Sequence, residues 1–173
     1  MICPSCGHTN IPGVDSCTWC LADLGPLDLP VAQNPVEQSL MHDSVRLLEP
    51  RPPVTLPLSA TIHEAIQVMV RREIGAVLVV DAQGLLHGIL TERDLLMKIN
   101  FEQESEYQRQ ITDFMTANPE TIGSHVSIAF ALHKMNIGGY RHLPVVANHK
   151  PIGTISIRDI TRHMTQLCRK AAS

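Results

Sequence analysis

The segment Gly88-Ile89-Leu90-Thr91-Glu92-Arg93-Asp94 occurs again 65 residues later as Gly153-Thr154-Ile155-Ser156-Ile157-Arg158-Asp159. Each copy contains an apolar run, a hydroxyl residue, and an aspartate three positions further on. Upstream of both copies an offset of 66 aligns further residues: Pro53 with Pro119, Thr55 with Thr121, Ile62 with Ile128, Ala65 with Ala131, Met69 with Met135, and Val79-Val80 with Val145-Val146. Self-similarity at a fixed period indicates a duplicated supersecondary unit.

Each copy has the pattern of a small β-α-β-β-α unit. A Pro-x-Thr strand at 53–56 or 119–122 precedes a helix whose apolar residues recur at helical spacing. Apolar strands follow at 77–80 and 143–146, and the repeated segment supplies one more strand and the start of a second helix. One copy cannot cover both faces of its sheet, so we expect the two to pack about a pseudo-twofold axis. The predicted fold class is α/β, with an α+β-like arrangement.

Composition excludes several classes of protein. The 173 residues are 44% hydrophobic and 18% charged, which is too apolar for intrinsic disorder and long enough for a core. Aromatic residues make up 3%, so stacking platforms for single-stranded nucleic acid are scarce. No apolar run is long enough to span a bilayer, and Met1-Ile2-Cys3-Pro4 has no signal-peptide character. We therefore expect a soluble, cytoplasmic protein.

Four of the five cysteines form two hooks near the N-terminus, Cys3-x-x-Cys6 and Cys17-x-x-Cys20. This spacing is typical of a tetrahedral four-thiolate zinc site. Gly7 permits the turn after the first hook, whereas Leu21 stands at the corresponding position of the second. We predict a structural zinc ribbon over residues 1–24, because so short a segment needs a cross-link such as a bound metal ion to fold. Two disulfides or a redox-active pair are the alternatives, and both fit an intracellular chain poorly.

Charge is distributed unevenly along the chain. Residues 1–35 contain three aspartates and no Lys or Arg, while residues 36–173 hold 14 acidic and 14 basic residues. Metal-bound thiolates would add negative charge to the first segment, so we expect it to repel nucleic acid. The Pro-containing stretch 25–35 predicts an extended linker between the two parts.

The duplicated part resembles the cystathionine β-synthase (CBS) domain, and the tandem resembles a CBS pair, or Bateman module. The most specific elements are Leu143-Pro144-Val145-Val146, the opening Ile111-Thr112-Asp113-Phe114-Met115-Thr116, and the repeated segment that ends at Asp94. The resemblance covers residues 36–173, with repeats over 36–100 and 111–173 and a linker or helix over 101–110. The first copy departs from the family at Leu78, where proline is usual, and in its opening at 45–50.

This resemblance implies regulation by an adenosine-containing ligand such as AMP, ADP, ATP, NAD or S-adenosylmethionine. Asp94 and Asp159 stand where the family places the carboxylate that accepts hydrogen bonds from both ribose hydroxyls. Thr91 and Ser156 stand at the strand-to-helix turn, where hydroxyls and helix amides can meet ligand oxygens. The other implied ligand-binding residues are Thr55 and Thr121 on the first strands, Gly88 and Gly153, which leave room, and Arg141 and His142, which suit phosphate. The first copy has no basic pair there, so we expect the two clefts to differ.

Each of these motifs also has a purely structural explanation. A Ser/Thr-x-x-Asp sequence is a helix capping box, which would preserve both aspartates without any ligand. For Arg141 and His142 the alternative is a solvated strand edge with an ion pair. For Thr55 and Thr121 it is ordinary β propensity.

No catalytic motif is recognisable, so we predict a regulatory module that is not an enzyme. The resemblance implies a homodimer formed through the CBS helices, and the ribbon would serve as an appendage for an unidentified regulated protein. Two alternatives remain open: a ligand-silent scaffold whose ribbon binds protein or nucleic acid, and a redox or metal sensor acting through the four thiolates.

Overall fold

The computed structural model describes residues 2–11, 14–22, 24 and 32–171. The chain divides into two compact units, Met1–Asn34 and Pro35–Ser173. Most of the predicted linker, residues 25–31, lies outside the described residues. Within the described part, none of the helices combines the length and the apolar character needed to cross a membrane.

The N-terminal unit is organised around its cysteines. Cys3, Cys17 and Leu24 are buried and form a small core. The same backbone turn follows each hook, because the Gly7 N–H donates to the Cys3 carbonyl at 2.8 Å and the Leu21 N–H donates to the Cys17 carbonyl at 2.9 Å. Leu21 has a φ of 59°, close to the 74° of Gly7. The second hook therefore adopts the knuckle turn although this conformation is unfavourable for leucine.

The first repeat builds a four-stranded sheet of order β1-β2-β3-β4. Its strands are β1 (Thr55–Pro57), β2 (Ala76–Val80), β3 (Leu86–Thr91) and β4 (Thr116–Ala117), with α2 (Ile62–Arg72) and α3 (Glu92–Lys98) beside them. β1 runs parallel to β2, and the other neighbours are antiparallel. Ile62, Ala65 and Met69 form the buried stripe of α2, as the helical spacing predicts.

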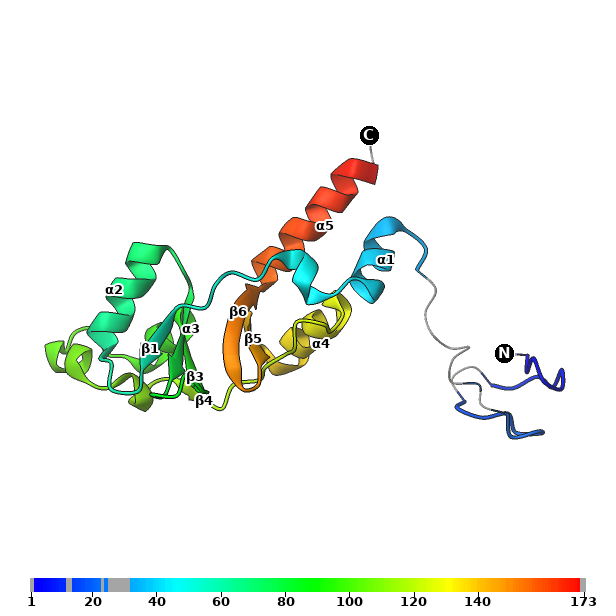
Figure 1. The fold of residues 1–173 in the computed structure, drawn as a ribbon, viewed down its shortest axis with the longest axis horizontal. Coiled ribbons are helices and arrows are strands. Elements are labelled where there is room, and N and C mark those ends of the chain that lie inside the picture. Colours follow the sequence, from blue (N-terminus) through cyan, green and yellow to red (C-terminus); the bar gives the residue numbers. More distant parts are fainter. Residues whose placement is uncertain (1, 12–13, 23, 25–31, 172–173) are drawn as a thin grey trace. The chain divides into compact units, whose positions relative to one another are not determined.

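The second repeat is built around an antiparallel pair of strands. Its elements are β5 (His142–Ala147), β6 (Lys150–Ser156), α4 (Ile128–Gly138) and α5 (Ile157–Ala171), and α1 (Pro35–His42) packs on α4 and α5 (Figure 1). The strand predicted at 119–122 is reduced to a parallel bridge between Ile122 and Val145. Asn118 has a φ of 48°, and Pro119 has no N–H to donate to a ladder. The β-α-β-β-α organisation is otherwise confirmed.

The opening segment of each repeat crosses to the other repeat. The 3-10 helix η4 (Ile111–Asp113) belongs to the second copy by sequence, yet Ile111 lies in the core of the first repeat, and β4 extends that sheet. The 3-10 helix η2 (Val45–Leu48) opens the first copy, yet Val45 lies in the core of the second. Between the repeats, residues 104–108 form the 3-10 helix η3 (Glu104–Gln108).

The backbone beyond η2 completes this exchange. Arg51 and Thr154 donate N–H groups to each other's carbonyls at 3.2 and 3.0 Å, which places Arg51 on the edge of β6. Each repeat therefore finishes the sheet and the core of its partner, and the two form one structural unit.

Candidate functional site

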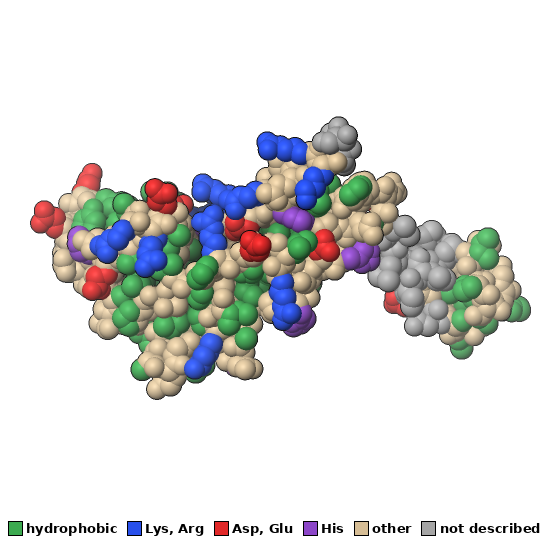
Figure 2. All heavy atoms as spheres, turned by 45° about the horizontal axis from the view of Figure 1, so that its top comes forward, with side chains coloured by type: hydrophobic (Ala, Val, Ile, Leu, Met, Phe, Trp, Pro, Cys, Tyr) green, Lys and Arg blue, Asp and Glu red, His purple; other side chains and the backbone are tan. Residues whose placement is uncertain are grey.

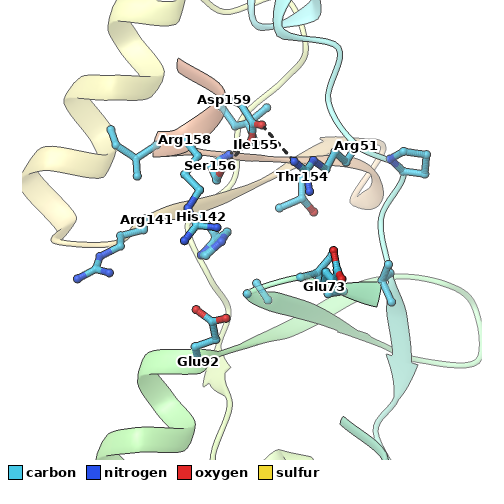
Figure 3. A pocket seen from close by; sticks show the side chains of 16 residues that line it. Arg51, Glu73, Glu92, Arg141, His142, Thr154, Ile155, Ser156, Arg158 and Asp159 are labelled. Carbon is cyan, nitrogen blue, oxygen red and sulfur yellow. Dashed lines mark hydrogen bonds and ion pairs between the residues drawn. The ribbon is translucent and has the colours of Figure 1, made fainter. Parts of the chain in front are cut away.

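A pocket opens between the two repeats at the start of α5 (Figure 3). Its second-repeat wall carries Arg141, His142 and Arg158, together with Ser156 and Asp159. From the first repeat, Glu73 after α2 and Glu92 at the start of α3 face this wall. Arg51 reaches the pocket through the crossing segment described above. The pocket is therefore lined by both signs of charge.

Asp159 presents one occupied and one available oxygen. Its Oδ2 accepts hydrogen bonds from the Ser156 backbone N–H at 2.8 Å and the Ser156 hydroxyl at 2.7 Å. Its Oδ1 has longer ion-pair contacts, with Arg162 at 3.5 Å and Arg51 at 4.0 Å, and both arginine side chains are more than half exposed. The carboxylate itself is 10% exposed. Among the residues that the structure describes, none makes a short hydrogen bond to Oδ1, so a nearly buried acceptor faces the pocket.

His142 lies where the two walls meet. A Cβ on Gly75 would come within 3.1 Å of Glu92 Oε2 and 3.2 Å of His142 Cε1, so the missing side chain gives these two groups their space. Burial lowers the pKa of His142 below its ordinary value, and this effect outweighs the opposing influence of Glu92 and Asp159. His142 is consequently neutral at pH 7.

Figure 2 shows cationic side chains gathered near the middle of the larger unit, with acidic side chains close by.

Asp94, at the equivalent position of the first repeat, has partners on both oxygens. Oδ2 accepts from the Thr91 backbone N–H at 2.9 Å and from the Thr91 hydroxyl at 2.6 Å. Oδ1 accepts from Lys98 Nζ at 2.8 Å and, at 3.5 Å, from the Thr116 hydroxyl. Burial alone would raise the pKa of Asp94, but the Lys98 ammonium and the Thr91 hydrogen bonds hold it below its usual range.

The structure gathers some of the predicted ligand-binding residues and separates others. Four of them line the pocket: Arg141, His142, Ser156 and Asp159. Thr91 and Asp94 form the capping box of α3, as the structural alternative proposed. Thr55 is exposed on β1, and Thr121 lines a different pocket with Pro119 and His149.

Gly88 and Gly153 are covered by the crossing segments. A Cβ on Gly88 would collide with the Met115 side chain, and one on Gly153 would lie 2.7 Å from Pro50 Cβ. The space beside both glycines is therefore filled by protein, which gives them a packing role. Their contact with a ligand stays a prediction.

Sequence reasoning missed several residues of the pocket. Arg158 belongs to the repeated Arg-Asp pair, which was a usable signal. Glu92 follows the capping threonine directly and could have been found on the same grounds. Arg51 could not have been found in this way, because it reaches the pocket on the opening segment that crosses to the other repeat. The repeat offset does not reveal this crossing.

The four thiols of the N-terminal hooks converge on one point. Their sulfurs all lie within 4.8 Å of one another, with Cys3 and Cys20 at 3.6 Å and Cys6 and Cys17 at 3.7 Å. A tetrahedron with Zn–S bonds of about 2.3 Å has sulfurs about 3.8 Å apart, whereas a disulfide brings them to about 2.05 Å. Backbone N–H groups of Cys20 and Trp19, with the Asn10 amide, lower the pKa of Cys17 to about 6. This donor set fits zinc.

Comparisons with known proteins agree with the geometry. The model of the CBS domain matches residues 47–100 and 111–166. The CBS domain-containing protein CBSCBSPB1 of Arabidopsis thaliana is 32% identical over 135 residues, which are 78% of this chain and 25% of that protein, so the chain spans about a quarter of this relative's length. The crystal structure of the CBS-domain containing protein ATU1752 from Agrobacterium tumefaciens matches with a TM-score of 0.63 and 31% identity, covering 69% of this chain and 94% of that one. CBSX2, crystallised with AMP, shares the fold at a TM-score of 0.63 and 23% identity, over 73% of this chain and 98% of its own.

Proposed function

Because the chain belongs to the CBS domain family, whose members are regulatory modules, we propose that it senses an adenosine-containing ligand and signals its presence to a protein partner. The observation that carries this proposal is the available Oδ1 of Asp159 in a pocket whose second-repeat wall also carries Arg141 and Arg158. The module acts without catalysis of its own. AMP is the first ligand to test, since the related CBSX2 holds AMP.

The pocket offers a separate group for each polar part of such a ligand. A ribose has two neighbouring hydroxyls that can donate to a carboxylate, and charge assistance strengthens these bonds. Asp159 supplies that carboxylate, and the Ser156 backbone amide at the helix start fixes its orientation. Arg141, Arg158 and His142 suit the phosphate, while Glu73 and Glu92 limit how much negative charge the pocket accepts.

The test is thermal stabilisation of the zinc-loaded chain by AMP, ADP, ATP, NAD and S-adenosylmethionine, with GMP as the control. A ligand present at 100 times its Kd adds about 2.7 kcal/mol to the folded state. A saturable rise of Tm with one adenosine compound, lost in Asp159→Ala, supports the proposal. The absence of any rise at millimolar ligand would contradict it.

For the N-terminal hooks we propose one structural zinc ion, held by Cys3, Cys6, Cys17 and Cys20. The tetrahedral sulfur spacing supports this, and the ion would supply the cross-link that so small a unit needs. Metal analysis of the purified chain is expected to find one zinc per chain, and Cys17→Ser should abolish it. A chain that keeps two disulfides and no zinc would overturn the assignment.

A scaffold that works through its ribbon is the second candidate function. The ribbon exposes four large apolar side chains by 69% to 78%: Ile2, Ile11, Trp19 and Leu21. Such exposure on a small unit favours protein docking over nucleic-acid binding. In this case the adenosine panel would give no stabilisation, and a partner protein would shift the fluorescence of Trp19, the single tryptophan of the chain.

We also propose that the chain forms a homodimer through its CBS helices. Val70 on α2, Leu96 and Met97 on α3 and Ile137 on α4 are each more than 70% exposed, although they are large and apolar. Light scattering after size-exclusion chromatography is expected to give twice the mass of the chain. Leu96→Glu should reduce it to one chain, because a charge cannot be buried in the interface without a partner.

A further inference from the structure

The two equivalent aspartates differ in the residue four positions further along the helix. Lys98 follows Asp94 and lies 2.8 Å from its Oδ1. His163 occupies the same place after Asp159, but its Nε2 lies 2.7 Å from the Ser39 hydroxyl on α1. One repeat therefore directs a cation at its own carboxylate, and the other ties the equivalent side chain to a different helix.

Lys98 is held in place from two sides. Besides Asp94, its ammonium donates to the Phe114 carbonyl at 2.6 Å. The segment that follows contributes the Thr116 hydroxyl to the same carboxylate oxygen. Both Phe114 and Thr116 belong to the opening of the second copy, which crosses onto the first sheet. The exchange of openings thus delivers the groups that occupy Asp94.

His163 is held away from Asp159 by a buried hydroxyl. Ser39 is 6% exposed and donates to Asp43 Oδ2 at 2.5 Å, so its oxygen accepts from the imidazole. Turning His163 back toward Asp159 would break this arrangement. The contacts left to Asp159 Oδ1 are the long ones from Arg51 and Arg162, both well hydrated.

We propose that Lys98 is a built-in occupant of the Asp94 carboxylate, so that each chain binds a single adenosine ligand, at Asp159. The inference rests on the proposed function. A ribose hydroxyl approaching Asp94 would have to displace a hydrogen bond in which both partners are charged with one in which only the carboxylate is charged, which is unfavourable. Lys98 is therefore the residue that determines how many ligands the pair takes.

Calorimetric titration of the zinc-loaded full chain with AMP and with adenosine tests this proposal. The native chain is expected to bind one ligand per chain, and Lys98→Met to bind two. The matched control Lys98→Arg retains a cation and should still bind one ligand per chain. The double variant Lys98→Met, Asp94→Asn should also bind only one ligand per chain. Because the uncharged Thr116 pairs with Ile89 as Arg51 pairs with Thr154, the opened site has no arginine at this position. We therefore expect AMP to bind it about tenfold more weakly than the Asp159 site.

Several results would overturn the inference. Two sites in the native chain, one of them lost in Asp94→Asn, would show that Lys98 is no barrier. A single site in Lys98→Met, with circular dichroism and Tm showing an intact fold, would show that something else closes the cleft. Should Lys98→Met fail to fold, Lys98→Gln replaces it in the same titration.

Failure of the proposed function gives a different pattern. If the native chain binds neither compound, the sensor proposal fails, and Lys98→Met alone then decides the inference. A new saturable site that Asp94→Asn removes would uphold the part of the inference in which Lys98 blocks Asp94, while the single site at Asp159 would be overturned. No site in that variant would overturn it as well.

Discussion

Asp94 and Asp159 begin from the same sequence motif and end with different surroundings. In both, a hydroxyl residue and an aspartate three positions later bond to each other at the start of a helix. In the first, a lysine on the same helix occupies the remaining carboxylate oxygen, and in the second no short hydrogen bond does. The comparison teaches that the motif places a carboxylate at the start of each helix, whereas the residues around the carboxylate determine whether a ligand can bind to it.

The largest expected effect comes from neutralising each aspartate in turn. Asp159→Asn removes the charge that strengthens two ribose hydrogen bonds, so we expect AMP affinity to fall about 100-fold, or about 2.7 kcal/mol. Asp94→Asn is the matched control and should leave the affinity unchanged. Isothermal titration measures both. Equal losses of AMP affinity in the two variants would show that both aspartates take part in binding, contrary to this comparison.

The next effect separates phosphate recognition from ribose recognition. Arg158→Ala is expected to weaken AMP about tenfold and to leave adenosine unaffected, because one charge-assisted contact is lost. Arg93 occupies the equivalent position of the first repeat, and Arg93→Ala should change neither affinity. If Arg158→Ala weakened adenosine as much as AMP, the phosphate would have to lie elsewhere.

A smaller effect is expected from pH, through His142. Burial lowers the pKa of His142 in the free chain, and a bound phosphate would raise it by favouring the imidazolium. Proton uptake then accompanies binding, so AMP affinity should rise a few-fold as the pH falls from 8 to 6. The phosphate of AMP also titrates in this range, so His142→Gln provides the baseline. Parallel pH profiles in the two proteins would contradict this role.

The smallest expected effect is the contribution of the Lys98–Asp94 ion pair to thermal stability and its dependence on pH. The pKa of Asp94 is lowered in the folded chain, so its contribution to stability is present above the unfolded pKa of about 4 and is lost as the pH falls through the folded pKa. Lys98 is 40% exposed, so solvent screening keeps the pair's contribution below about 1 kcal/mol, or about 2 °C in Tm. The native chain should melt above Lys98→Met by that margin at pH 7, and the gap should shrink as the pH falls below the unfolded pKa of Asp94. A gap that stays constant as the pH is lowered would indicate lost packing instead.

Much of this fold could be predicted because its signals are local. Helical spacing identifies the buried stripe of α2, and the repeat offset identifies the second copy. The convergence of the four cysteines was predictable from their spacing, and Leu21 adopts the turn that lets its N–H donate to the Cys17 carbonyl. The crossing of the opening segments was not predictable. Arg51 belongs by sequence to the first repeat but pairs with the second, and Phe114 belongs to the second but contacts Lys98 of the first. For the same reason the space that glycine leaves at 88 and 153 is filled by the chain itself.

The crossing openings have a consequence for how this unit could have arisen. A single repeat on its own would leave one sheet edge unpaired and part of its core uncovered, since both are completed by the other repeat's opening. Two identical single repeats could satisfy each other by trading openings, as domain-swapped dimers do. The present chain is equivalent to such a dimer fused end to end. Within one chain the two halves can differ in sequence, as the lysine after Asp94 and the histidine after Asp159 show.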